Sequence, residues 1–237
     1  SAQTGHGGRG VVLHAAEAQQ AFLQHCNAVE AWPVCAEVAT AAFQDRAREK
    51  RYLGGATLVA LAVEVKTSKV AFAWAGDSTG IIVRGGRTVF RTSRHTVDNK
   101  GERQRLETHL PKYNFYFRDG YLCGASWSAG CVMPTRGLGD VDLEDAGFLA
   151  VPETSALLEV TAEDTIVMAS DGLWDVVSEE EVLAVLGDGQ LTLQEKARSL
   201  AEAAVKAWFF QYGRASEADD ISVLLYQPKQ ATTSTEL

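Results

Sequence analysis

The order of secondary-structure signals along the chain is the feature that most constrains its fold. A strand-rich middle separates two helical parts. Leu58–Val65 and Val70–Ala75 are apolar runs typical of strands, and Ile81–Val83 and Thr88–Phe90 flank a glycine turn as the arms of a hairpin would. The sequence has no internal repeat and no linker rich in Pro, Gly or Ser. These features predict one α+β domain.

Helices are predicted on both sides of this middle part. Apolar residues recur every three or four positions from Val11 to about Val29, Pro33 breaks the pattern, and a second helix is predicted over Val34–Arg51. Further helices are predicted at Glu102–Leu110 and over Leu193–Phe210. Between them, a capping box formed by Ser178 and Glu181 predicts a helix that ends at Leu186. Further strands are predicted at Ala156–Val160, Thr165–Ala169 and Ile221–Tyr226.

Charge and cysteine content restrict the classes of function. The chain has 31 acidic and 22 basic residues and a formal net charge of −9, so its average field repels nucleic acids and anionic membranes. We expect neither as a partner. No apolar run approaches the roughly 18 residues of a membrane helix, and no signal sequence opens the chain, so cytosol or nucleus is the default location. The four cysteines form no C-x-x-C pair, and we expect them reduced and mostly buried.

Two motifs partly match the sequence patterns of known phosphate-binding loops. Gly5 to Gly10 match G-x-G-x-x-G, but a dinucleotide-binding loop needs a strand before it, and here only four residues precede the first glycine. Cys131 and Arg136 resemble the cysteine and arginine of a cysteine phosphatase loop, but four residues separate them where that loop has five. We interpret the first motif as a glycine-rich helix start and the second as a structural cysteine beside a loop arginine.

Aspartates beside turn residues recur at the ends of predicted strands. Asp77, Asp140, Asp171 and Asp219 all have this placement, and we expect them to converge. Clustered carboxylates raise one another's pKa unless cations neutralise them. Oxygen ligands without a His or Cys cluster favour Mg²⁺ or Mn²⁺ over Zn²⁺. Spacing alone leaves two alternatives, a metal hydrolase and a set of ordinary turn residues that cap their own backbone.

Six segments, in order along the chain, resemble motifs of one family. They are Gly5-His6-Gly7-Gly8, Gly54-Gly55-Ala56-Thr57, Gly76-Asp77-Ser78, Thr135-Arg136-Gly137-Leu138-Gly139-Asp140, Ala169-Ser170-Asp171-Gly172-Leu173-Trp174-Asp175 and Asp219-Asp220-Ile221-Ser222-Val223. Together they resemble the PPM, or type 2C, family of metal-dependent protein serine/threonine phosphatases. The resemblance extends from Gly5 to about Tyr226, which is nearly the whole chain.

The resemblance implies a fold and a set of residue roles. The fold would be a four-layer α-β-β-α sandwich, with two antiparallel sheets flanked by helix pairs. Asp171 and Asp219 would ligate one of two Mg²⁺ or Mn²⁺ ions, the Gly5 carbonyl would bind the other, and His6 would be the general acid. A metal-activated water would hydrolyse phosphoserine and phosphothreonine in proteins. We expect phosphorylated proteins as partners, a monomer, a phosphatase domain over residues 1–228 that is N-terminally incomplete, and a polar tail over 229–237.

Two positions depart from the family pattern. Thr4 stands where the family has an aspartate that bridges both metals, and Arg94 stands where the family has an aspartate that serves an additional metal. His95, Glu102 and Arg105 follow at the family's spacing. Arg94 places a fixed positive charge where a cation would lie, so it either repels that metal or replaces part of its charge. Two hypotheses follow: an active phosphatase, or a phosphatase-like binding or regulatory module with impaired metal coordination.

Overall fold

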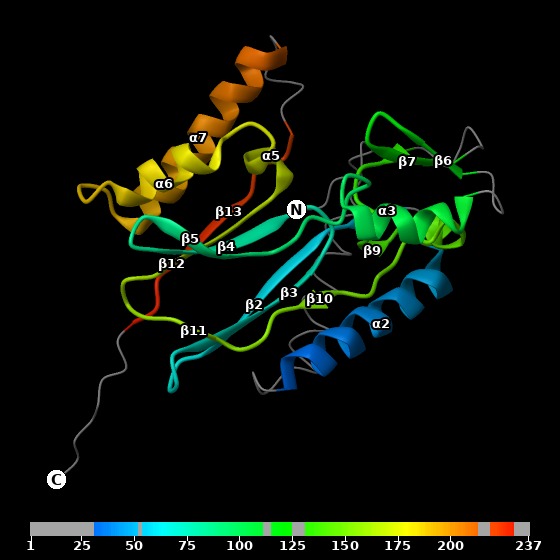
Figure 1. Cartoon of the computed structure of the whole chain (residues 1–237), viewed down its shortest axis with the longest axis horizontal. Helices are drawn as coiled ribbons and strands as arrows, with labels where there is room; N and C mark the ends of the chain where they lie inside the picture. The colour runs from blue at the N-terminus through cyan, green and yellow to red at the C-terminus, as the bar shows by residue number, and fades with distance from the viewer. Residues whose placement is uncertain (1–30, 52–53, 111–114, 125–130, 213–218, 230–237) are drawn as a thin grey trace.

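Two antiparallel four-stranded sheets form the centre of the molecule in the computed structural model (Figure 1). The structure describes residues 31–51, 54–110, 115–124, 131–212 and 219–229. The helix predicted from Val11 to about Val29 lies outside these residues. In chain order the elements are α2 (Trp32–Lys50), β1 (Gly55–Ala56), β2 (Leu58–Glu64), β3 (Lys69–Ala75), β4 (Thr79–Arg84), β5 (Arg87–Arg91), α3 (Lys100–Glu107), β6 (Phe115–Arg118), β7 (Tyr121–Gly124), β8 (Cys131–Val132), β9 (Leu138–Gly139), the 3-10 helix η2 (Val141–Ala146), β10 (Glu153–Thr154), β11 (Leu158–Glu159), β12 (Thr165–Ala169), α5 (Asp171–Trp174), α6 (Glu179–Gly187), α7 (Leu193–Tyr212) and β13 (Val223–Tyr226).

The predicted strands form the two sheets. In one sheet β2 pairs with β3 along its full length, and β10 and β11 lie on the other edge of β3. In the other sheet the order is β13-β12-β4-β5. The hairpin prediction is confirmed, with Gly85 and Gly86 at φ 55° and 73° in its turn. The strand predicted at Ala156–Val160 is shorter, because the Ser155 hydroxyl accepts the Phe72 N–H and interrupts the ladder between β10 and β11.

Alternating side chains build the layers. From β3, Val70, Phe72 and Trp74 pack between the sheets against Ile82 of β4 and Ile166 of β12. The intervening alanines of β3 face α2, whose buried side consists largely of small residues. In the other sheet the alternate residues of β4 and β12 pack against α6 and α7. Helices therefore cover the outer side of both sheets, and the α+β prediction is confirmed (Figure 1).

Each helix predicted within the described residues begins and ends within three residues of the observed one, with the largest difference at α3, which ends at Glu107 rather than Leu110. Pro33 does not precede its helix but lies in the first turn of α2, where a missing backbone N–H costs no intrahelical hydrogen bond. The capping box is confirmed: Ser178 Oγ accepts from the Glu181 N–H at 3.3 Å, and Glu181 Oε2 accepts from the Ser178 N–H at 2.9 Å. Among the described residues, no helix combines the length and hydropathy that crossing a membrane requires.

A smaller three-stranded sheet, in the order β6-β7-β8, lies beside α3 and η2. A disulfide joins Cys123 of β7 to Cys131 of β8, and Cys35 of α2 is also disulfide-bonded. The prediction of reduced cysteines is therefore wrong for this structure. Cys123 and Cys131 lie directly opposite each other in the antiparallel pair of β7 and β8, and sequence spacing does not reveal this register. Disulfides persist mainly in oxidising compartments, so these bonds do not favour the cytosolic or nuclear location, which stays a prediction.

Candidate functional site

Three of the four predicted aspartates meet at one end of the sheets, and a fourth carboxylate that we did not single out joins them. Asp77 follows β3, Asp171 opens α5 directly after β12, and Asp219 precedes β13. Asp175 follows α5, and its N–H donates to the Asp171 carbonyl at 2.9 Å. The charges of Asp77, Asp175 and Asp219 all act on the Asp171 carboxyl. We call Asp77, Asp171, Asp175 and Asp219 the acidic cluster.

Hydrogen bonds from the backbone and side chain of Ser170 bring Asp171 and Asp219 together. The Ser170 N–H donates to the Ser222 carbonyl at 3.1 Å, and the Ser170 hydroxyl donates to the Asp220 carbonyl at 2.9 Å. The segment before β13 therefore runs alongside the start of α5. Gly172 permits this close approach, because a Cβ at that position would lie 2.5 Å from the Asp220 carbonyl oxygen.

Two tryptophans fix α5 in place. The Trp174 indole N–H donates to the Thr79 carbonyl of β4 at 3.1 Å, and the Trp208 indole of α7 donates to the Gly172 carbonyl at 2.7 Å. The Asp-Gly-Leu-Trp-Asp sequence therefore supplies two carboxylates and one of the indole donors that position them, and α7 supplies the other donor.

Burial and mutual repulsion raise the pKa values of the cluster. Burial, followed by the charges of Asp77, Asp219 and Asp175, raises the pKa of Asp171 to about 7. Burial also raises the pKa of Asp77 and that of Asp219. Asp77 Oδ2 is buried and has no hydrogen-bond partner among the residues described. An unpaired buried oxygen beside other carboxylates is an arrangement that a cation would stabilise.

Arg94 contributes a positive charge to the acidic cluster. Its Nη1 donates to Asp175 Oδ1 at 2.7 Å, and its charge lowers the pKa of Asp77 against the larger effect of burial. The family resemblance predicts Arg94 at a cation position, and in the structure its guanidinium pairs with Asp175 of the cluster.

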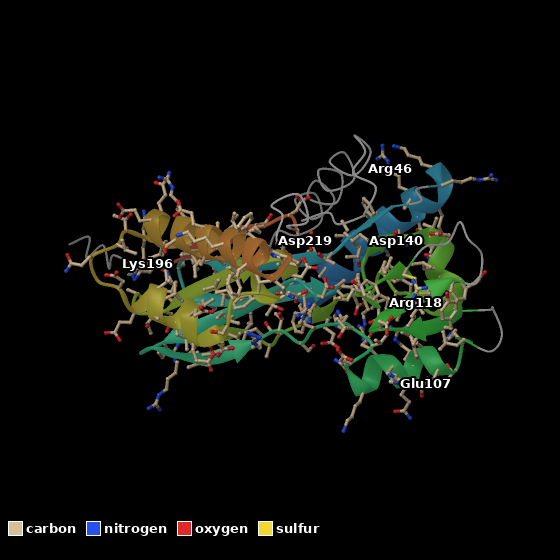
Figure 2. The ribbon with its side chains drawn as sticks, turned by 90° about the horizontal axis from the view of Figure 1, so that it is seen from above. Arg46, Glu107, Arg118, Asp140, Lys196 and Asp219 are labelled. Atoms are coloured by element: carbon tan, nitrogen blue, oxygen red, sulfur yellow. A yellow bond between two sulfur atoms is a disulfide. The ribbon has the colours of Figure 1, made fainter. Side chains whose placement is uncertain are left out.

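Asp140 does not join the acidic cluster. It lies directly after β9. Its side chain packs against Gly55, because a Cβ added to Gly55 would lie 2.0 Å from Asp140 Oδ2. Burial and then the charge of Asp142, rather than any member of the cluster, raise the pKa of Asp140 to about 7. Figure 2 shows Asp140 apart from Asp219. The expected convergence therefore holds for Asp77, Asp171 and Asp219 only.

Replacing Asp140 with asparagine is expected to stabilise the protein increasingly as pH rises. Below about pH 4 the Asp140 carboxyl is protonated in both the folded and the unfolded protein. Between about pH 4 and 7 this carboxyl ionises in the unfolded chain but stays protonated in the folded protein. The carboxyl therefore removes stability as pH rises from about 4 to 7, by on the order of 4 kcal/mol at most. Asparagine also suits the left-handed backbone of this position, where φ is 43°.

Thermal unfolding between pH 4 and 8 checks this expectation. Exposed Asp145 on η2 provides the control substitution, Asp145→Asn, which should change the midpoint little at any pH. A midpoint difference between Asp140→Asn and the parent protein that does not grow with pH would contradict the buried-carboxyl explanation.

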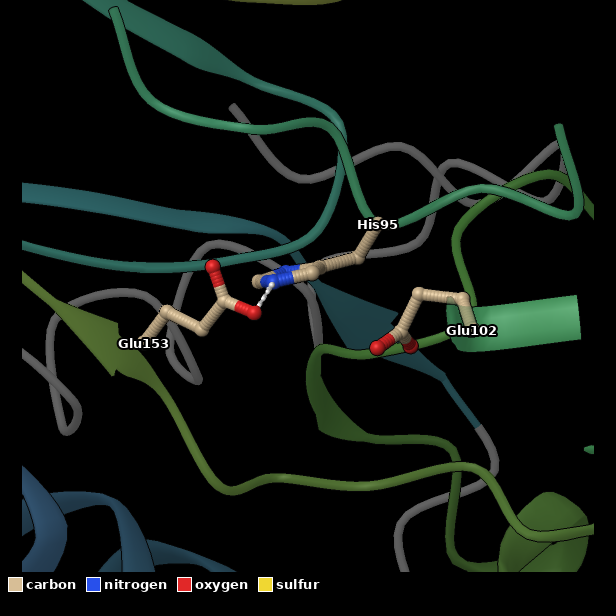
Figure 3. A group of neighbouring side chains, drawn as sticks. All are labelled: His95, Glu102 and Glu153. Atoms are coloured by element: carbon tan, nitrogen blue, oxygen red, sulfur yellow. Dashed lines mark ion pairs between the residues drawn. The ribbon is translucent and has the colours of Figure 1, made fainter. Parts of the chain in front are cut away.

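His95, Glu102 and Glu153 form a second group of titratable side chains. They place one polar atom each within 4.8 Å of one another (Figure 3). Glu102 of α3 already accepts hydrogen bonds from Thr135, Arg105 and Arg136. Two guanidiniums beside this carboxylate disfavour an additional cation.

The hydrogen bonds of His95 also exclude it as a metal ligand in this arrangement. Its Nδ1 accepts the Gly76 N–H at 3.1 Å, so in the neutral ring the proton lies on Nε2, which faces Glu153 Oε1 at 3.4 Å. Burial, followed by the charge of Arg136, lowers the pKa of His95 and favours this neutral form. The His95 N–H also donates to the Gly76 carbonyl at 2.9 Å. His95 therefore holds the peptide that precedes Asp77.

The fold and the site define an α+β domain with two packed antiparallel sheets and an acidic site at their edge. Residues 3–208 match the family model described as protein phosphatase 2C. The chain therefore belongs to the protein phosphatase 2C family. The sequence-predicted residues Thr4, Gly5 and His6 lie outside the described residues.

Curated relatives agree with this family. The chain is 30% identical over 168 residues to "Probable protein phosphatase 2C 33" of Arabidopsis thaliana, covering 67% of this chain and 34% of that protein. It is 33% identical over 175 residues to "Probable protein phosphatase 2C 68" of Oryza sativa subsp. japonica, covering 73% of this chain and 45% of that protein. The chain thus spans less than half the length of these two relatives.

Two solved structures share the fold. A C. elegans sex determining protein matches with a TM-score of 0.72 and 22% identity, covering 94% of this chain and 54% of that one. The catalytic domain of the serine threonine protein phosphatase PstP, in complex with 2 manganese ions, matches with a TM-score of 0.57 and 18% identity, covering 95% of this chain and 88% of that one.

Proposed function

We propose that this domain hydrolyses phosphoserine and phosphothreonine in proteins and requires Mg²⁺ or Mn²⁺. The observation that carries the proposal is the meeting of Asp171 and Asp219 at the sheet edge, in a chain of the protein phosphatase 2C family. Phosphorylated proteins are the proposed partners. A monomer completes the proposal.

The described residues fit divalent cations. The acidic cluster offers oxygen donors only, its carboxylates raise one another's pKa, and buried Asp77 Oδ2 has no hydrogen-bond partner in the described part of the chain. In the proposal Asp171 and Asp219 hold one of two ions, and the Gly5 carbonyl binds the other. Divalent ions at such a site activate water for attack on phosphorus and offset the charge of the phosphate.

The chain's own residues have three tasks in this proposal. Ser170, Trp174 and Trp208 hold the start of α5, and therefore Asp171, in a fixed position through their hydrogen bonds. His95 holds the peptide before Asp77. His6, by its resemblance to the family motif, donates a proton to the leaving serine or threonine oxygen.

A second candidate is a phosphatase-like binding or regulatory module. The ion pair between Arg94 and Asp175 favours it, because a guanidinium already neutralises part of the cluster. Thr4 favours it too, since a neutral hydroxyl replaces the bridging carboxylate of the family pattern. Calorimetry with Mn²⁺ separates the two candidates: the enzyme takes up Mn²⁺ at the acidic cluster, and the module binds it weakly or not at all.

Hydrolysis assays test the enzyme directly. With Mn²⁺ present, we expect turnover of p-nitrophenyl phosphate and of a phosphothreonine peptide, and we expect EDTA to abolish both. A heat-denatured sample of the same preparation provides the blank. Turnover that persists in EDTA, or no turnover by the full-length protein with either substrate, would overturn the proposed function.

A further inference from the structure

Arg94 pairs with one carboxylate of the acidic cluster and acts electrostatically on a second. Its Nη1 pairs with Asp175 Oδ1 at 2.7 Å, and its charge also acts on the buried Asp77 carboxyl. Both members of the ion pair are largely shielded from solvent, with side chains 31% and 26% exposed. A charge pair in this setting is screened less than one on an open surface.

The backbone around Arg94 holds it in this position. Its successor, His95, makes two hydrogen bonds to Gly76, one through its backbone N–H at 2.9 Å and one through Nδ1 at 3.1 Å. The Asn99 side-chain amide donates to the Arg94 carbonyl at 3.3 Å. Because Gly76 immediately precedes Asp77, these contacts join the segment that carries Arg94 to the segment that carries Asp77.

A cavity of about 490 Å³ adjoins the ion pair. Arg94 and Asp175 lie on its wall together with Asp98 and Asp119. The acidic groups therefore outnumber the single guanidinium among these charged lining residues. Shortening Arg94 would leave room beside Asp175 for a hydrated divalent ion and would leave its carboxylate without its present partner.

We propose that the Arg94 guanidinium occupies one cation position of the acidic cluster, so that the cluster binds one divalent ion fewer than its carboxylates would otherwise accept. Arginine keeps its charge at all relevant pH values, and its planar guanidinium binds carboxylates directly. A divalent ion at Asp175 would have to displace Arg94 and would be repelled by it. This inference rests on the proposed function only in assuming that the cluster binds divalent ions.

Counting bound Mn²⁺ tests the inference without an activity assay. Isothermal titration calorimetry, together with electron paramagnetic resonance of free Mn²⁺, gives the number of ions per chain. We expect Arg94→Ala to bind one Mn²⁺ more than the parent protein and Arg94→Lys to keep the parent's count. Arg103→Ala removes the same charge from an exposed pair on α3 and should also keep the count.

Thermal unfolding provides a second measurement. In EDTA, Arg94→Ala should unfold at a lower temperature than the parent, because its acidic cluster has lost a counter-charge. Saturating Mn²⁺ should then raise the midpoint of Arg94→Ala more than that of the parent. Arg103→Ala should respond to Mn²⁺ as the parent does.

The outcomes separate this inference from the proposed function. If the parent binds Mn²⁺ and Arg94→Ala binds the same number of ions, the inference is wrong and the proposed function stands. If only Arg94→Ala binds Mn²⁺, the inference is supported and the proposed metal-dependent activity of the natural chain is contradicted. If neither protein binds Mn²⁺, both are overturned.

Discussion

Asp171→Asn is expected to reduce Mn²⁺-dependent hydrolysis of a phosphothreonine peptide by about 10²- to 10³-fold, the usual cost of losing one group that stabilises charge in a transition state. Asparagine is nearly the same size and retains the oxygen that accepts the Gly172 N–H at 3.0 Å. The substitution therefore removes the charge while preserving the local hydrogen bond. Steady-state kinetics at saturating Mn²⁺ measures the effect.

The same substitution should stabilise the metal-free protein. Asp171 is buried, and the charges of Asp77, Asp219 and Asp175 act on it, so an uncharged side chain relieves repulsion. In EDTA the variant should unfold at a higher temperature than the parent, and Mn²⁺ should raise its midpoint less. A loss of activity that came from misfolding would lower the midpoint instead.

Asp188→Asn provides the matched control. Asp188 is exposed at the end of α6, and its side chain accepts only a local hydrogen bond from the Gln190 N–H. This variant should keep full activity and the full response to Mn²⁺. If Asp171→Asn retained parental activity and the parental Mn²⁺ response, Asp171 would have no part in metal binding.

Local patterns predicted the elements of the fold well. The extents of β3, β12 and α7 agree with their apolar patterns to within two residues, because β3 and β12 pack on both faces and α7 packs on one. The errors occur where a single side chain competes with the backbone. The Ser155 hydroxyl interrupts the strand predicted at Ala156–Val160, and Pro33 fits inside a helical first turn that we expected it to precede.

The acidic site was predicted in part. The strand-end positions of Asp77, Asp171 and Asp219 were visible in the sequence, and all three contribute to the cluster. Asp175 was missed, although its spacing of four residues from Asp171 places it on the same side of a helical turn. Asp140 lies outside the acidic cluster because β9, which precedes it, pairs with β1. Each of these strands has only two residues, so no hydrophobic periodicity in the sequence predicts their pairing.

Glu102 connects α3 to the segment after β8, and its replacement should cause a large loss of stability. Its carboxylate is buried and accepts from Thr135 Oγ1 at 2.7 Å, from Arg105 Nη2 at 2.6 Å and from Arg136 Nε at 3.0 Å. Glu102→Gln leaves two partly buried guanidiniums without their shared counter-charge. We expect a loss of about 3 kcal/mol in the free energy of unfolding at pH 7, measured by urea denaturation.

The pH dependence distinguishes lost charge from disturbed packing. Hydrogen bonds from Arg136, Thr135 and Arg105 outweigh burial and lower the pKa of Glu102 to about 2. A carboxyl with a lowered pKa contributes stability above its unfolded value of about 4.5 and loses that contribution as pH falls toward 2. The free energies of the parent and Glu102→Gln should therefore converge as pH falls from about 5 toward 2. Glu107→Gln breaks an exposed ion pair on the same helix and should cost less than about 0.5 kcal/mol throughout. A constant difference between Glu102→Gln and the parent across this pH range would assign the effect to packing rather than to the carboxylate charge.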